Sequence, residues 1–152
     1  MISNEEIYQK YLDELTKEIL FRYNSQGRKA SGGFEKEIES VTTETSMKLI
    51  GVPYAPFVEK GRGPGRFPPV KAIEDWIEVK QGLPAIFKEK KKQFAFLIGR
   101  KIAQQGTDGS DILESVIQEF VDNKLFTMLD ELGDVYAVRI QNDIVRLIKK
   151  FN

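Results

Sequence analysis

The spacing of apolar residues at the start of the chain predicts an amphipathic helix. Ser3 and Glu6 have the spacing of a capping box, in which the two residues satisfy each other's backbone N–H groups. Apolar residues then recur every three or four positions through about residue 23, which is the period of a helix with one buried face. A polar, glycine-containing stretch at 24–33 predicts a flexible loop.

The next segment, 34–51, fits two patterns. Phe34, Ile38 and Val41 have helical spacing, whereas the run of β-branched residues from Val41 to Thr43 favours a strand. We expect two strands, near 35–43 and 46–51, with a turn around Thr43–Thr45.

Helical periodicity returns after Pro69, which is expected to open a helix that runs to about Lys80. Gly82 and Pro84 then stop it, and a second helix is predicted over 85–105. The apolar stripes of these two helices consist of Val70, Ile73, Trp76 and Ile77, and of Phe87, Phe94, Leu97, Ile98 and Ile102. Phe96 points away from its stripe and is either a lone exposed residue or a contact for another subunit.

The last third of the chain is also predicted to be helical. A helix capped by Ser110 or Asp111 is expected to break or bend at Gly133. The tail from Asp134 keeps helical spacing, although a short strand before a final helix also fits its first residues. The pattern as a whole predicts a helix-rich α+β single domain, 1–152, with a small antiparallel β-hairpin and long C-terminal helices.

Composition limits the chemistry that this chain can perform. The 152 residues include no cysteine and no histidine, which excludes disulfides, thiolate or imidazole metal sites and imidazole catalysis. An enzyme would therefore have to work with carboxylates, lysine, serine or tyrosine alone. No apolar run reaches the roughly 18 residues of a membrane span, and the first residues do not resemble a signal peptide. A soluble protein made in a cytoplasm is expected.

Charge is balanced overall but unevenly placed. Lys and Arg total 23, as do Asp and Glu, whereas residues 60–101 carry a net charge of +7 and residues 111–134 a net charge of −6. Opposite patches suit head-to-tail association of identical copies. Alternatively, both patches are solvated or pair within one subunit.

The segment 54–69, YAPFVEKGRGPGRFPP, is the most unusual of the chain. Tyr54, Phe57 and Val58 are expected to pack a turn against the core, with Glu59 accepting hydrogen bonds from nearby backbone or arginine donors. A projecting loop follows, formed by Gly61, Arg62, Gly63, Pro64, Gly65 and Arg66. It lacks the spacing of a phosphate-binding loop. Three interpretations remain, namely a flexible structural loop, a protein-docking loop and a nucleic-acid contact.

Two other charged clusters invite a functional interpretation. Asp75, Glu78 and Lys80 superficially resemble the acid-x-Lys core of metal-dependent nucleases, but they lie on a predicted helix, where a solvated face is the alternative. The second cluster consists of Lys88, Lys90, Lys91 and Lys92. In the first turns of a helix these lysines oppose the helix dipole, so they are expected to meet DNA phosphates, an acidic neighbour or solvent.

An ordered set of motifs between about residues 47 and 110 resembles the neck and tail-completion proteins of tailed bacteriophages. The set consists of Tyr54-Ala55, Phe57-Val58-Glu59, Gly61, a proline-led helix with Ile73 and Trp76-Ile77, Arg100-Lys101-Ile102, and Gly106-Thr107. Arg62 stands where the family usually has threonine, and the GPGR extension before Phe67 is not part of the usual pattern.

The resemblance implies a structural subunit of the virion that forms a sixfold or twelvefold ring around the DNA channel. It also implies no catalysis, no cofactor, no metal and no small-molecule substrate. Its implied partners are copies of itself and neighbouring portal, connector or tail proteins, with only transient contact with passing DNA and no membrane. Arg62 and Arg66 would contact a neighbouring subunit or the channel, and Phe96 with the Lys88–Lys92 cluster would belong to a subunit interface. The rival interpretation is a small nucleic-acid-binding module that uses the same cations.

Overall fold

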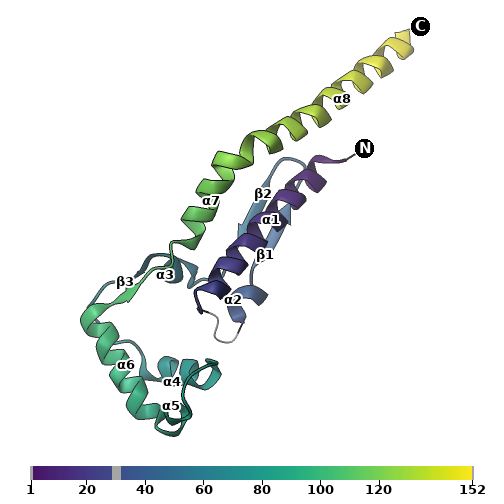
Figure 1. Cartoon of the computed structure of the whole chain (residues 1–152). Helices are drawn as coiled ribbons and strands as arrows, with labels where there is room; N and C mark the ends of the chain where they lie inside the picture. The colour runs from purple at the N-terminus through teal and green to yellow at the C-terminus, as the bar shows by residue number, and fades with distance from the viewer. Residues whose placement is uncertain (1, 29–31, 152) are drawn as a thin grey trace. The chain divides into compact units, whose positions relative to one another are not determined.

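The helix-rich α+β class is confirmed. The computed structural model describes residues 2–28 and 32–151 and is 68% helical, with two small antiparallel two-stranded sheets and a long C-terminal helix (Figure 1). Contacts along the chain define two compact units. Unit 1 comprises residues 1–19, 39–50 and 114–152, and unit 2 comprises residues 20–38 and 51–113. Within the described residues, no helix is both long enough and apolar enough to cross a bilayer.

Unit 1 is built from helices and one hairpin. Its elements are α1 (Asn4–Ser25) up to Ile19, β1 (Glu39–Thr42), β2 (Met47–Ile50), α7 (Ile112–Asn123) from Glu114, and α8 (Leu125–Phe151). The hairpin confirms the two predicted strands, with Glu39 opposite Ile50 and Thr42 opposite Met47. At the turn, the Thr43 N–H donates to the Ser46 carbonyl over 2.8 Å.

The predicted capping box starts α1. The Glu6 N–H donates to the Ser3 hydroxyl over 3.1 Å, and the Ser3 N–H donates to the Glu6 carboxylate over 2.6 Å. The helix then continues to Ser25, slightly beyond the predicted end. In the segment predicted to be a flexible loop, a turn follows at Gly27, and residues 29–31 lie outside the described part of the chain.

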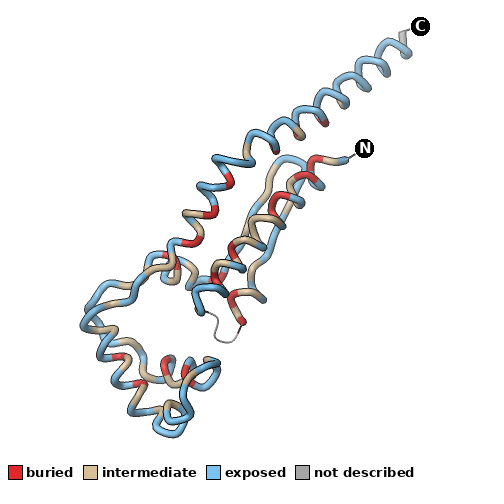
Figure 2. The backbone as a smooth tube through the Cα atoms, viewed as in Figure 1, coloured by how far each residue is buried: buried red, intermediate tan, exposed pale blue. Residues whose placement is uncertain are grey.

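The core of unit 1 lies among its three helices (Figure 2). Its buried residues are Ile7 and Tyr11 on α1, Phe120 on α7, and Met128, Leu132 and Val135 on α8. Tyr11 and Phe120 meet edge to face, with ring centroids 5.9 Å apart, which is a favoured arrangement for aromatic pairs.

The C-terminal half contradicts the predicted break at Gly133 and confirms the helical tail over the alternative of a short strand. Gly133 does not break the helix, and residues 134–140 form no strand, because α8 runs without interruption to Phe151. One glycine costs a helix interior only about 1 kcal/mol, which a long helix with a packed face tolerates. The interruption lies instead at Lys124, between α7 and α8.

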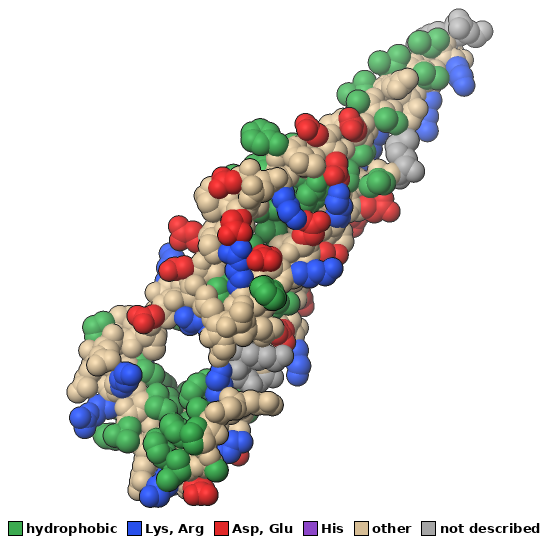
Figure 3. All heavy atoms as spheres, in the orientation of Figure 1, with side chains coloured by type: hydrophobic (Ala, Val, Ile, Leu, Met, Phe, Trp, Pro, Cys, Tyr) green, Lys and Arg blue, Asp and Glu red, His purple; other side chains and the backbone are tan. Residues whose placement is uncertain are grey.

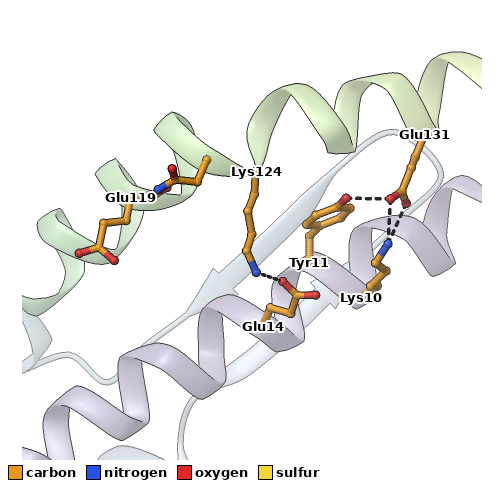
Figure 4. Close-up of polar contacts among 7 residues, drawn as sticks. Lys10, Tyr11, Glu14, Glu119, Lys124 and Glu131 are labelled. Carbon is orange, nitrogen blue, oxygen red and sulfur yellow. Dashed lines mark hydrogen bonds and ion pairs between the residues drawn. The ribbon is translucent and has the colours of Figure 1, made fainter.

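Acidic and basic side chains are interspersed over the face of unit 1 seen in Figure 3, and several of them pair. Lys10 donates to both carboxylate oxygens of Glu131 over 2.8 and 3.0 Å, and the Tyr11 hydroxyl donates to the same carboxylate over 2.8 Å (Figure 4). Lys124 pairs with Glu14. The Lys10–Glu131 pair therefore neutralises part of the acidic excess of residues 111–134 within the chain itself.

The Glu131 contacts predict a pH dependence of stability. The hydrogen bonds from Lys10 and Tyr11 hold the pKa of Glu131 below its ordinary value. A carboxyl whose pKa is lowered on folding contributes stability above its unfolded pKa, and this contribution is lost as the pH falls through the folded pKa. Glu131→Gln should therefore destabilise the protein at pH 7 and make its stability fall less between about pH 5 and pH 3. Urea unfolding at pH 7, pH 5 and pH 3 measures these changes, and the exposed Asp130→Asn is the control. Equal pH dependence of stability in the parent and in Glu131→Gln would contradict the prediction.

Unit 2 contains the end of α1 from Leu20, the start of α7 up to Leu113, and the remaining elements. The remaining elements are α2 (Gly33–Lys36), α3 (Ala55–Lys60), β3 (Gly61–Arg62), α4 (Val70–Val79), α5 (Ala85–Glu89), α6 (Lys91–Gln105) and β4 (Thr107–Asp108). The short helix α2, which was not predicted, is the reason that β1 begins later than expected. Its Phe34 is buried against Tyr23, with stacked ring centroids 4.3 Å apart.

The core of unit 2 lies between α4 and α6. Pro69 stands before the first residue of α4 as predicted, and Ile73 and Ile77 are buried together with Ala95 of α6. Phe87, Phe94, Ile98 and Ile102 pack around them, but Leu97 is exposed, so its place in the predicted stripe is wrong. The contacting face of α6 uses the small residues Ala95 and Gly99 instead, which allow a close approach.

The predicted helix over 85–105 is two helices. Lys90 has a non-helical backbone (φ −111°, ψ 40°) and separates α5 from α6. The break lets Phe87 and Phe94 stack on each other, with ring centroids 4.1 Å apart.

Candidate functional site: a glycine ribbon and an aromatic groove

A short antiparallel ribbon joins two segments that are far apart in the sequence. β3 pairs with β4, so that Gly61 lies opposite Asp108 and Arg62 opposite Thr107. This pairing was not predicted, because a two-residue strand leaves no periodic pattern. The projecting loop and the glycine-containing turn after α6 thus form one structure.

The ribbon depends on glycines in both segments. A Cβ added at Gly61 would lie 2.7 Å from the backbone N of Gly109, and one added at Gly106 would lie 2.9 Å from the backbone C of Gly63. Both glycines also have φ of +74°, which side-chain-bearing residues rarely adopt. The two strands can approach this closely only because these side chains are absent.

The loop 61–66 is exposed, as expected, but hydrogen bonds hold it at its base. The Gly65 N–H donates to the carbonyl of Ala103 over 2.8 Å, and the Arg62 guanidinium donates to the carbonyl of Arg66. Gly63, Pro64 and Arg66 face solvent between these anchors. The backbone is thus fixed while the Arg66 side chain stays accessible.

Glu59 is the buried polar residue that connects this ribbon to α7. Its carboxylate accepts hydrogen bonds from the Ser110 hydroxyl over 3.2 Å and from the Leu113 N–H over 2.9 Å. The second bond satisfies a backbone donor in the first turn of α7, so Glu59 caps that helix from a distance. The expectation that Glu59 accepts from nearby backbone is confirmed for this contact.

Glu59→Ala should destabilise the protein by about 2 kcal/mol, because it removes a helix cap and leaves the Leu113 N–H without that acceptor. Thermal or urea unfolding measures the change. Lys60→Ala, at the exposed neighbouring position, is the matched control and should change stability by less than about 0.5 kcal/mol. Equal stability of the two variants would contradict the capping role.

The aromatic residues of the motif meet in one surface groove, here called the aromatic groove. Tyr54, Phe57 and Val58 line it together with Trp76, and its volume is about 480 Å³. Tyr23 completes the apolar lining, and Arg28 and Lys80 stand at its edge. Burial raises the pKa of both Tyr23 and Tyr54.

The groove corrects the expected role of these residues. Phe57 is 66% exposed and Tyr54 is also exposed, so they do not pack a turn against the core, although Val58 is half-buried. Trp76 is exposed as well, so its place in the predicted buried stripe of α4 is wrong. Phe57 lies on α3, a short helix that presents its side chain to solvent, and no sequence pattern distinguishes the buried from the exposed side of a helix of six residues. The motif residues come together on the surface.

The other predicted contact residues lie apart from this groove. Phe96 is 53% exposed and touches Phe67, with ring centroids 5.6 Å apart. Lys88 occupies the last turn of α5, where a cation is favoured, and only Lys91 and Lys92 lie in the first turn of α6. The expectation of four lysines opposing one helix dipole is therefore wrong, because the helix breaks at Lys90.

The nuclease-like residues do not converge. Asp75 pairs with Lys71 over 2.8 Å, Glu78 pairs with Lys91 over 3.2 Å, and Lys80 donates to the carbonyl of Gly27. Over residues 2–28 and 32–151, no group of three or more acidic side chains is arranged to hold a metal ion.

No protein-family model matches the chain, and comparisons with curated proteins and with solved structures give no match.

Proposed function

We propose that this chain is a structural subunit of the neck of a tailed-bacteriophage virion, where it forms a ring that joins the head or portal to the tail around the DNA channel. One observation carries the proposal. Motif residues from two segments, 54–62 and 106–109, are joined by the ribbon, and the adjoining aromatic side chains remain exposed. Clustered exposed aromatic residues are typical of protein–protein interfaces.

The aromatic groove and the loop 61–66 would serve different contacts in such a ring. Tyr54, Phe57 and Trp76 offer rigid apolar surface with little side-chain entropy to lose, which suits a segment of a neighbouring subunit or of a portal, connector or tail protein. Arg66, on its anchored loop, would reach a neighbouring subunit or the channel. Because the chain has no net charge, it would bind the DNA phosphates only weakly while DNA passes through the channel.

Assembly state tests the proposal. Mass photometry and negative-stain microscopy, with the protein alone and with a purified portal complex, should show rings. Phe57→Ala and Trp76→Ala should weaken ring formation without lowering the melting temperature, whereas Phe21→Ala, which is also exposed but outside the groove, should leave it unchanged. A chain that stays monomeric under all these conditions and never accompanies virions would overturn the proposal. Tight binding of duplex DNA that falls steeply with salt would instead support a nucleic-acid-binding module.

A further inference from the structure

The C-terminal part of α8 exposes an apolar stripe. Val135 is the last buried residue of this helix, and beyond it Figure 2 shows an almost uniformly exposed tube. Large apolar residues nevertheless continue at helical spacing, and the most exposed of them are Ile140, Ile144, Leu147 and Ile148. At about 100° per residue they share one face, which differs from the face that carries Met128, Leu132 and Val135 in the core.

This stripe ends in a cluster of positive charge. Residues 136–150 contain four basic residues and one acidic residue, a net charge of +3. Arg139 lies 3.9 Å from Glu44 of its own subunit, whereas Arg146, Lys149 and Lys150 are exposed near the end of the helix. Figure 3 shows hydrophobic and basic side chains along this part of α8.

Unit 1 also carries a groove between α1 and α7 that is lined by acidic side chains, in contrast to the basic end of α8. It is here called the acidic groove. Leu15, Val116 and Phe120 provide its apolar lining, and Glu14, Glu18 and Glu119 stand around it with Lys124. Its volume is about 250 Å³, which is below the range of roughly 300–1,000 Å³ typical of small-molecule sites. It has room for a few apolar side chains of another protein segment.

We propose that the apolar, basic end of α8 docks into the acidic groove of a second copy of this chain. The match is twofold: Leu147 and Ile148 supply apolar side chains for the lining, and Lys150, which lies beside Leu147 on the helix surface, meets the glutamates. Two α8 ends packed on each other would place like charges together, which is unfavourable. The acidic groove is therefore the better-matched surface.

Such a contact joins two different surfaces of identical subunits. Heterologous contacts of this kind produce a closed ring when the rotation between copies closes, and a filament when it does not. The inference deepens the proposed ring assembly and rests on it for its biological role, although the docking itself can be measured on the purified protein alone.

Disulfide trapping tests the geometry, because the chain has no cysteine of its own. Asn123→Cys places a thiol in the acidic groove, and Ile148→Cys places one on the stripe. Oxidation of a mixture of the two single variants should give a mixed dimer. Asn142→Cys, on the opposite face of α8, is the matched control and should cross-link to Asn123→Cys at least about tenfold less. Equal cross-linking of the control, or dimers of Ile148→Cys with itself in place of mixed dimers, would overturn the proposal.

A charge exchange tests the electrostatic part. Lys150→Glu and Glu119→Lys should each weaken self-association about tenfold, and the double variant should recover most of it. Lys36→Glu, a lysine outside both surfaces, controls for the change in net charge. Failure of the double variant to recover any association would overturn the pairing of these two charges.

The outcomes separate this inference from the proposed function. Rings that form equally well with Lys150→Glu, and that show no Asn123–Ile148 cross-link, would overturn α8 docking and leave the neck proposal standing. A specific cross-link and charge recovery in a protein that never joins portals or virions would support α8 docking and overturn the neck proposal.

Discussion

Gly106→Ala is expected to lower the free energy of unfolding by about 4 kcal/mol, the sum of backbone strain and steric overlap. The residue has φ of +74° and ψ of −162°, a conformation available almost only to glycine. Its added Cβ would also press on the backbone of Arg62, Gly63 and Pro64, which cannot move aside as a flexible side chain would. Denaturant unfolding of the purified variant measures the loss.

Gly63→Ala is the matched control for this variant. A Cβ at Gly63 would meet nothing within 4 Å, and its φ is not in the left-handed region, so its stability should stay within about 0.5 kcal/mol of the parent. Similar stabilities for the two alanine variants would mean that the β3–β4 ribbon does not form as described.

Ile77→Ala should cost about 3 kcal/mol, because Ile77 is fully buried between α4 and α6 and its removal leaves a cavity. The same measurement on Val79→Ala, a large-to-small change at an exposed position of the same helix, should show a loss below about 1 kcal/mol. A small loss for Ile77→Ala would show that the α4–α6 packing is looser than the structure indicates.

The sequence was sufficient to predict the elements that are governed by local rules. The capping box of Ser3 and Glu6, the hairpin turning after Thr43 and the proline-led helix α4 each depend on residues that lie close together in the chain. Hydrophobic periodicity likewise located most of α1 and the buried residues of α4. In these places local propensity and tertiary packing favour the same structure.

The remaining features depend on contacts between distant residues. The β3–β4 ribbon, the capping of α7 by Glu59 and the convergence of Tyr54 with Trp76 connect segments whose proximity no local pattern reveals. Gly133 misled the prediction because a weak helix breaker was overridden within a long helix. Periodicity located the apolar residues of the C-terminal tail. It did not show that these residues would be left exposed in the described part of the chain.

The interlocking of the glycines at 61, 106 and 109 has a practical consequence for protein engineering. In each case the space that a side chain would occupy is filled by backbone from the other segment. The conformation of each segment therefore depends on the presence of the other. A chimera that receives only residues 61–66 would lose the conformation of that loop. Crossover points should therefore be chosen so that residues 59–66 and 103–110 travel together as a single cassette.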